Sequence, residues 1–203
     1  MAQNADLKRY KILEAAKKRF SHFGLAKTTM AEIAQDLSFS KALLYYYYPD
    51  KHSLFAAVLE FVFNEFSEKI NDIIELNDDI EVTLMKIIES RILSIEEHYS
   101  LFEMGHNFRR DVPNELTCII QNSFEVEVNH LKTVLQKGID KGELAMDNVE
   151  EVAKLLLYSI YGMRFGVLKD VNWIAFPTPE EFHQILRMQQ KMTKIFIKGL
   201  RIN

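Results

Sequence analysis

Three glutamate–histidine pairs in this chain have a spacing that could hold iron. Each matches the Glu-x-x-His pattern of di-iron carboxylate bundles: Glu103 and His106, Glu127 and His130, Glu180 and His183. Such a site needs two pairs and two further glutamates, all facing one bundle core. Helical phasing argues against it, because His130 lies about 120° from the apolar face of its predicted helix. A di-iron oxidase therefore stays an alternative only, and we expect neither a metal nor another cofactor.

A lysine followed by a run of tyrosines forms a second chemically distinctive cluster. Ser40 can cap a short helix that begins at Lys41, and the preceding pattern predicts another short helix and a tight turn. In a helix-turn-helix the second helix enters the major groove, where Lys41 would donate to guanine edges or phosphates. Buried three-helix units share this pattern. Leu44 and Tyr48 fall on one face, which we expect to pack inward.

Charge separates the two parts of the chain. Residues 1–55 hold nine basic and five acidic side chains, a balance of +4, whereas the remainder carries −8. A basic segment on an acidic body favours contact of that segment alone with a polyanion such as DNA. Ordinary scatter of surface charge is the alternative interpretation. A helical adaptor that binds protein would also be acidic, but it would not need the basic segment.

The sequence contains no other recognisable catalytic group. It has no nucleophile elbow, phosphate-binding loop or Cys–His pairing, so we do not expect an enzyme. The single cysteine, Cys118, excludes an intramolecular disulfide and suits a reducing cytosol. No charge-free apolar stretch reaches the length of about 18 residues that a membrane span needs. We therefore expect a cytoplasmic protein without a membrane partner.

The segments that must position these residues all have helical patterns. Apolar residues recur at spacings of three and four up to Gly24, which can close the first helix. Helix caps or capping boxes are predicted at Thr29, Ser40, Asp50, Asp147 and Thr178. Further helices are expected over 79–98, 101–110 and 114–141. The fold class is therefore all-α, with about nine helices.

The first part of the chain resembles the TetR family of bacterial transcriptional regulators. The resemblance is carried by Ile12, Leu13, Ala15, Ala16, Phe20, Gly24, Thr28, Thr29, Ile33, Ala34, Ser40, Lys41, Leu44, Tyr45, Tyr46, Lys51 and Leu54. It implies a helix-turn-helix domain over 1–49 and a helical domain over 50–203 that dimerises and holds an effector. The family usually has glycine in the turn, where this chain has Ser38, and phenylalanine where it has Tyr48.

The resemblance also implies which residues meet double-stranded operator DNA. Base-facing or groove-facing positions are Lys41, Leu43, Tyr45 and Tyr46, and phosphate-contacting positions are Thr29, Tyr47 and Lys51. Thr28 and the start of the second helix also suit a phosphate oxygen. Ser38 and Ser40, at the turn, complete the predicted DNA-binding surface.

The helix that begins near Asp147 is apolar on nearly every side, so nearly every side must be buried. A partner subunit can bury it, together with a matching stripe on the last helix. A central core helix within one subunit is the alternative. The predicted homodimer interface comprises Leu155, Ser159, Gly162, Gly166, Ile185, Met188, Met192 and Ile195.

Aromatic side chains are frequent where the body helices should meet, which fits an apolar ligand cavity with a few polar groups. Aromatics at helical spacing are also typical of an ordinary core. The predicted effector-binding residues are Phe61, Phe66, Phe102, His106, Phe108, Phe124, Tyr158, Tyr161 and Phe165. We expect the cavity between the long fourth helix and the helix opened by Asp147. The sequence thus predicts a dimeric repressor that a small apolar or amphipathic effector releases from a palindromic operator.

Overall fold

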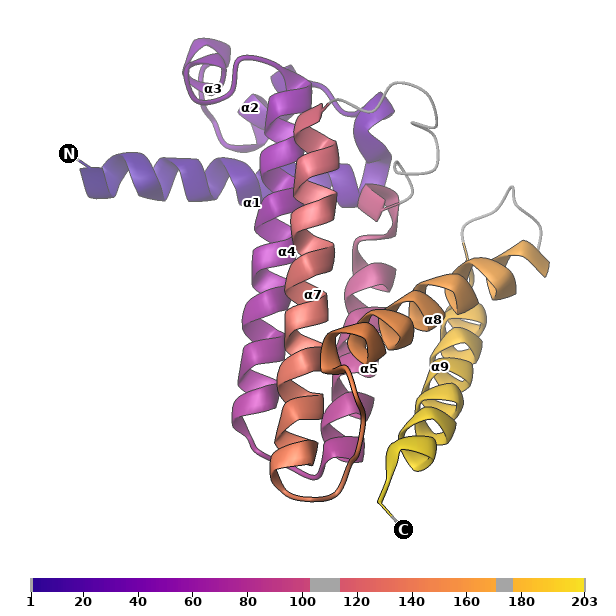
Figure 1. Cartoon of the computed structure of the whole chain (residues 1–203). Helices are drawn as coiled ribbons and strands as arrows, with labels where there is room; N and C mark the ends of the chain where they lie inside the picture. Colours follow the sequence, from indigo (N-terminus) through magenta and orange to yellow (C-terminus); the bar gives the residue numbers. More distant parts are fainter. Residues whose placement is uncertain (1, 103–113, 171–176, 203) are drawn as a thin grey trace. The chain divides into compact units, whose positions relative to one another are not determined.

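A computed structural model describes residues 2–102, 114–170 and 177–202 (Figure 1). These residues form helices and no extended strand, which confirms the predicted all-α class. The predicted helix over 101–110 lies almost entirely outside the described residues. The helices are α1 (Ala2–Lys27), α2 (Met30–Asp36), α3 (Lys41–Tyr47), α4 (Lys51–Glu75), α5 (Ile80–Glu97), α7 (Asn114–Asp140), α8 (Val149–Asp170) and α9 (Pro179–Leu200).

The chain divides into two compact units, which are described separately. The N-terminal unit comprises residues 1–65 and 97–122, and the C-terminal unit comprises residues 66–96 and 123–203. Helices α4 and α7 each continue from one unit into the other. The domain boundary predicted between residues 49 and 50 stays a prediction.

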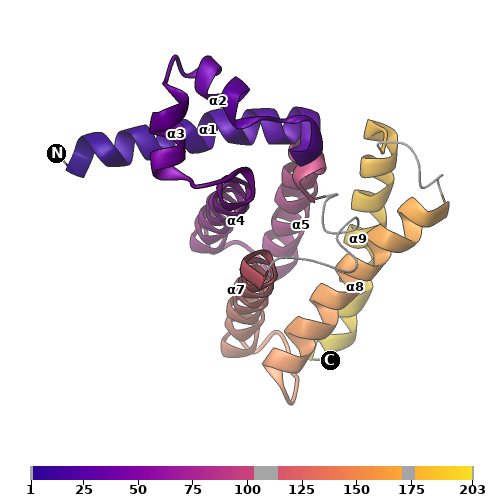
Figure 2. The ribbon, with the colours of Figure 1, turned by 90° about the horizontal axis from the view of Figure 1, so that it is seen from above.

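In the N-terminal unit, α1, α2 and α3 pack around a shared apolar core, and Figure 2 shows the three helices close together. Helix α1 is kinked at Gly24, whose φ of 72° lies in the left-handed region that glycine tolerates. The predicted capping box opens α2, since Thr29 and Glu32 bond reciprocally. Asp50 accepts a 2.8 Å hydrogen bond from the Ser53 amide and so caps α4 as predicted.

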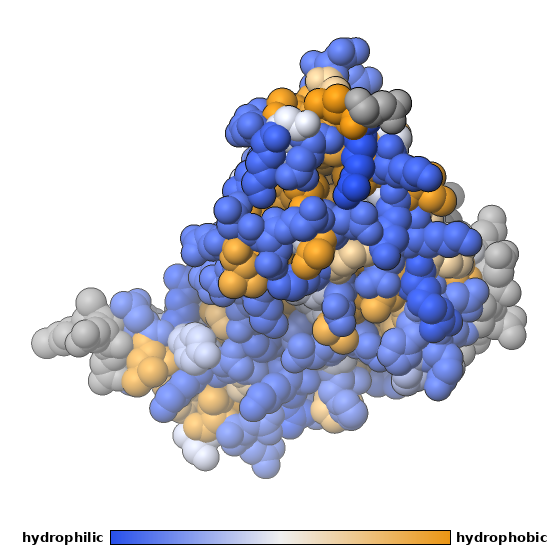
Figure 3. All heavy atoms as spheres, turned by 90° about the horizontal axis from the view of Figure 1, so that it is seen from below, coloured by the Kyte–Doolittle hydropathy of each residue, from blue (hydrophilic) through white to orange (hydrophobic). Residues whose placement is uncertain are grey.

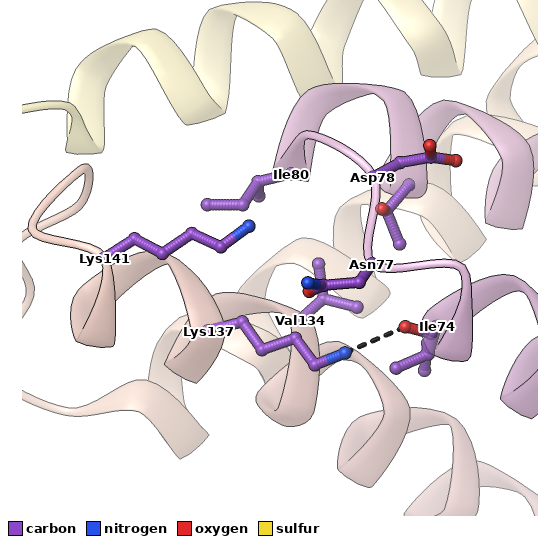
Figure 4. Close-up of a pocket in the computed structure, with 8 residues that line it drawn as sticks. Ile74, Asn77, Asp78, Ile80, Val134, Lys137 and Lys141 are labelled. Carbon is purple, nitrogen blue, oxygen red and sulfur yellow. Dashed lines mark hydrogen bonds between the residues drawn. The ribbon is translucent and has the colours of Figure 1, made fainter.

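The core of the C-terminal unit is built from α5, α8, α9 and parts of α4 and α7. Lys137 of α7 donates a 2.8 Å hydrogen bond to the Ile74 carbonyl in the last turn of α4, a contact drawn in Figure 4. This carbonyl, at the end of the helix, also accepts from the Asn77 amide at 3.3 Å. Gly138 lies so close to Ile80 and Leu144 that a Cβ atom there would clash with both side chains.

Helices α8 and α9 lie side by side in the C-terminal unit (Figures 1 and 2). Thr178 opens α9 with the predicted capping box, and Pro179 occupies the first turn. The helix cap predicted at Asp147 is wrong by one residue. Asn148 caps α8 instead, because its side-chain oxygen accepts hydrogen bonds from the amides of Glu150 and Glu151. Asparagine caps a helix as well as aspartate does, so the spacing could not separate them.

The face of the molecule in Figure 3 is mostly hydrophilic, with hydrophobic residues at scattered positions. Within the described ranges, no helix is both long enough and apolar enough to span a membrane.

Candidate functional site

The turn between α2 and α3 holds the two helices of the predicted helix-turn-helix in place. The amide of Phe39 donates 2.9 Å to the carbonyl of Ala34, and the amide of Ser38 donates 3.0 Å to that of Gln35. Ser38 adopts a φ of 53°, which is the left-handed conformation that glycine reaches without strain. The chain therefore makes this turn with serine in a glycine-like conformation.

Helix α3 is anchored by one buried face and presents the opposite face to solvent. Leu44 is fully buried and Tyr48 is 5% exposed, which confirms the prediction that both pack inward. Tyr46 is 82% exposed and Tyr45 is 49% exposed, and Lys41 also lies at the surface. Since the helix starts at Lys41, these side chains belong to a short rigid element suited to groove contact.

The starts of both helices are ordered by their own side chains. Ser40 Oγ accepts from the Leu43 amide at 3.1 Å. Thr29 Oγ1 donates 2.7 Å to Glu32, yet the residue stays exposed. Arg19 of α1 pairs with Asp36 at the end of α2 through two hydrogen bonds. The pair holds the pKa of Asp36 below its ordinary value and fixes α2 against α1.

The structure corrects the predicted role of the Thr28 side chain. Thr28 is fully buried, and its hydroxyl donates 2.8 Å to the Gly24 carbonyl at the kink of α1. A buried side chain committed to this bond cannot reach a phosphate. Lys51 is half-buried, and its ammonium donates 2.7 Å to the Leu25 carbonyl. Two of its three donors therefore remain for a phosphate.

The predicted effector-binding residues that the structure describes belong to both units. Phe124, Tyr158 and Tyr161 stack together in the C-terminal unit, with ring centroids of Phe124 and Tyr158 5.3 Å apart. Phe66 lines a cavity of the same unit. Phe61 and Phe102 belong to the N-terminal unit, where they contact Tyr10 and Phe63 respectively. His106, Phe108 and the side chain of Phe165 lie outside the described residues.

The cavity beside Phe66 contains a buried charge pair that sequence reasoning missed. Residues from α4, α5, α7 and α8 line it, including Arg91, Glu127 and His130. Arg91 Nε donates 2.8 Å to Glu127, and the Tyr161 hydroxyl donates 2.8 Å to the other carboxylate oxygen. The guanidinium also lies 4.2 Å from the centroid of the Tyr161 ring. The sequence carried a signal for this pair, because Arg91 lies on the buried face of α5, where the other residues are isoleucines, one leucine and one threonine.

Burial and charge set the protonation of this cluster. Burial disfavours the charged form of Arg91, but Glu127 and Tyr161 outweigh it and raise the pKa of the guanidinium. Burial lowers the pKa of His130, against a smaller opposing effect of Glu127. His130 was expected off the apolar face. It lines the cavity because α4 packs on that side, with Ser67 Oγ 3.4 Å from its Nε2. In the parts of the chain that the structure describes, no three histidine, cysteine or carboxylate groups could hold a metal.

The predicted dimer residues are mostly exposed on the isolated subunit. Leu155 is 55% exposed and Ile195 is 66% exposed, and Met188 also lies at the surface. The Cα atoms of Gly162 and Gly166 face open space. Ser159 and Met192 are half-buried, and the Ser159 hydroxyl donates to the Leu155 carbonyl at 2.8 Å. The structure corrects the predicted role of Ile185 in the dimer interface. Its side chain is fully buried within its own subunit, so it cannot contact a partner.

Comparisons with known proteins agree with the all-α fold and with the helix-turn-helix near the start of the chain. The family described as bacterial regulatory proteins, tetR family, matches residues 12–58. A crystal structure of a transcriptional regulator from Cytophaga hutchinsonii is 30% identical, with a TM-score of 0.84 over 94% of this chain and 97% of that one. A tetR-family regulator from Mesorhizobium loti, 19% identical, shares the fold with a TM-score of 0.78 over 97% and 98% of the two chains.

A curated relative is described as a negative regulator. It is the negative transcriptional regulator IcaR of the biofilm operon icaADBC in Staphylococcus epidermidis, 24% identical over 79% of this chain and 88% of the relative. No enzyme family is indicated by these similarities. With its helix-turn-helix, its all-α architecture and these relatives, the chain belongs to the TetR family of bacterial transcriptional regulators.

Proposed function

We propose that this regulator binds a palindromic operator as a homodimer, represses transcription there, and leaves the DNA when a small apolar or amphipathic effector binds. The observation that carries the proposal is the solvent-facing side of α3. Lys41, Tyr45 and Tyr46 project from a helix that Leu44 and Tyr48 anchor in the core. A rigid short helix with exposed donors is what major-groove readout requires.

The contacts divide by chemistry. Lys41, Leu43, Tyr45 and Tyr46 are assigned to base edges and the groove, where they set sequence preference. Thr29, Tyr47 and the remaining donors of Lys51 are assigned to phosphates, which position the protein without reading sequence. Ser38 and Ser40 lie exposed at the turn, close enough in sequence to α3 to join the backbone contacts.

A dimer supplies the second α3 that a palindrome needs, one helical turn or about 34 Å away. The exposed apolar side chains of α8 and α9 support this assembly, since such residues gain by burial against a second copy. Gly162 and Gly166 leave room for close approach of a partner helix.

Repression and effector release rest on separate support. The similar regulator IcaR is a negative regulator, which favours repression here. The cavity of the C-terminal unit favours an effector, and α4 runs without a break from Lys51, beside α3 in sequence, to the cavity residues Phe66 and Ile70. A ligand that prefers one arrangement of α4 would thereby change the DNA-binding population.

The test is a titration of fluorescent DNA from the promoter of the protein's own gene, followed by anisotropy at several salt concentrations. Lys41→Ala should weaken specific binding by about tenfold or more and relax sequence preference, as losing a base contact of 1–3 kcal/mol does. Lys69→Ala, at an exposed lysine of the C-terminal unit, is the matched control and should bind like the wild type. Equal binding of both variants and the wild type would contradict the assignment of α3.

A further inference from the structure

The cavity of the C-terminal unit combines an apolar wall with polar atoms that lack partners. Phe66, Ile87, Ile88, Leu131 and Ile160 contribute apolar surface from four helices. Its volume is about 10 Å³, close to the space that one water molecule needs. A larger occupant would therefore require these side chains to move apart.

Arg91 is the central polar group of this cavity. It is only 7% exposed, and its Nε is held by Glu127. Its Nη1 atom is buried without a hydrogen-bond partner. His130, which lines the same cavity, likewise has a buried Nδ1 atom without a partner. Buried donors are rarely left unsatisfied, so an orphaned guanidinium N–H in a cavity indicates a missing acceptor.

The charge balance decides which acceptor fits. Glu127 already neutralises Arg91, and burial lowers the pKa of His130, which favours its neutral form. An anionic ligand would add an uncompensated buried charge in a cavity that Glu127 also lines, which is strongly unfavourable. An uncharged oxygen acceptor receives the N–H of Arg91 without adding charge.

We propose that this cavity opens to take an uncharged amphipathic molecule, whose aliphatic chain lies among the isoleucines and leucines and whose hydroxyl or carbonyl oxygen accepts from Arg91 Nη1. The inference rests on the proposed effector response, and it names the chemical class of that effector. Arg91 supplies the donor for the ligand's oxygen, and Glu127, which neutralises Arg91, makes the pair favour uncharged head groups over carboxylates.

The experiment compares four probes with a ten-carbon chain on the full-length protein at pH 7.5: 1-decanol, methyl decanoate, decanoate and decane. Decane has no acceptor, so tighter binding of 1-decanol than of decane reports the hydrogen bond from Arg91. Calorimetric titration and melting temperature report binding. The first two should raise the melting temperature and bind about tenfold more tightly than decanoate, a difference of about 1.4 kcal/mol. They should also weaken binding to the operator.

Variants test whether the tighter binding of 1-decanol than of decane depends on Arg91. The paired change Arg91→Met with Glu127→Leu removes both charges together, so that neither is left buried alone. This variant should keep its fold and lose the preference for 1-decanol over decane. Arg187→Met, at an exposed arginine of α9, is the control and should keep the preference.

Two results would overturn the inference. Tighter binding of decanoate than of 1-decanol would refute the uncharged class while leaving an effector response in place. No shift of the melting temperature with any probe would mean that the cavity holds water alone. Operator binding without ligand, measured in parallel, tests the proposed DNA function independently of both results.

Discussion

Removing the carboxylate of Glu127 should be among the most destabilising single changes in the C-terminal unit. Glu127 accepts from Arg91 Nε and from the Tyr161 hydroxyl, both at 2.8 Å. Glu127→Leu would leave the guanidinium of Arg91 buried without its counter-charge. Breaking one partner of a buried ion pair costs about 3–5 kcal/mol. Tyr161→Phe, which removes only the hydrogen bond to the charged carboxylate, should cost about 1.5–3 kcal/mol.

The double variant shows how much of the cost of Glu127→Leu comes from leaving Arg91 without its counter-charge. Arg91→Met combined with Glu127→Leu removes both charges and replaces them with apolar side chains. Such replacements of whole buried pairs are often neutral or stabilising. The double variant should therefore be more stable than Glu127→Leu alone by about 2 kcal/mol or more.

The assay is urea unfolding followed by circular dichroism, at one fixed protein concentration because association changes apparent stability. For a chain of this length, a loss of 3–5 kcal/mol corresponds to a melting temperature lower by about 6–20 °C. A loss of less than about 1 kcal/mol in the free energy of unfolding of Glu127→Leu would contradict a buried, unscreened pair. So would a double variant that is no more stable than Glu127→Leu.

Four further expectations concern the turn, a close packing contact, the surface charge and the assembly. Ser38→Gly should stabilise the chain by about 0.5–1 kcal/mol in urea unfolding, because glycine adopts the φ of 53° without strain. Gly138→Ala should destabilise by about 1–3 kcal/mol in the same assay, since its Cβ would clash with Ile80 and Leu144. The hydrogen bonds from Lys154 and Lys132 lower the pKa of Glu150 from 4.5 to about 2, so its contribution to stability is present above pH 4.5 and is lost as the pH falls toward 2. Glu150→Gln should flatten the pH dependence of the melting temperature in that window. Met188→Glu should give monomers in sedimentation velocity, whereas Lys191→Glu, at an exposed position on the same helix, should leave a dimer.

Local signals predicted the helical elements well. Capping boxes at Thr29 and Thr178 and the cap at Asp50 lie where the spacing placed them, because a cap depends on residues within one turn. The inward face of α3 was also readable, since Leu44 and Tyr48 share a face at a spacing of four. Asp147 and Asn148 are both good caps, so the spacing alone could not choose between them.

Contacts between distant segments were the part that spacing could not predict. Ile185 and Met188 lie on one helix, three residues apart, and both belong to an apolar stripe. The stripe is wide enough to face two neighbours, so its pattern cannot say that Ile185 packs inside the subunit while Met188 stays exposed. Thr28 is likewise predicted to contact a phosphate oxygen, but the kink at Gly24 brings a carbonyl to its hydroxyl.

The Arg91–Glu127 pair shows why a charge in an apolar stripe is informative even when its partner is unknown. Glu127 matched a metal-ligand spacing with His130 on the same helix, whereas its actual partners are 36 and 34 residues away on α5 and α8. A carboxylate that neutralises an arginine and accepts from a tyrosine has little capacity left for a metal. The same ion pair leaves Arg91 Nη1 without a hydrogen-bond partner beside the cavity, so the pair that occupies Glu127 also leaves the donor that a ligand in the cavity would meet.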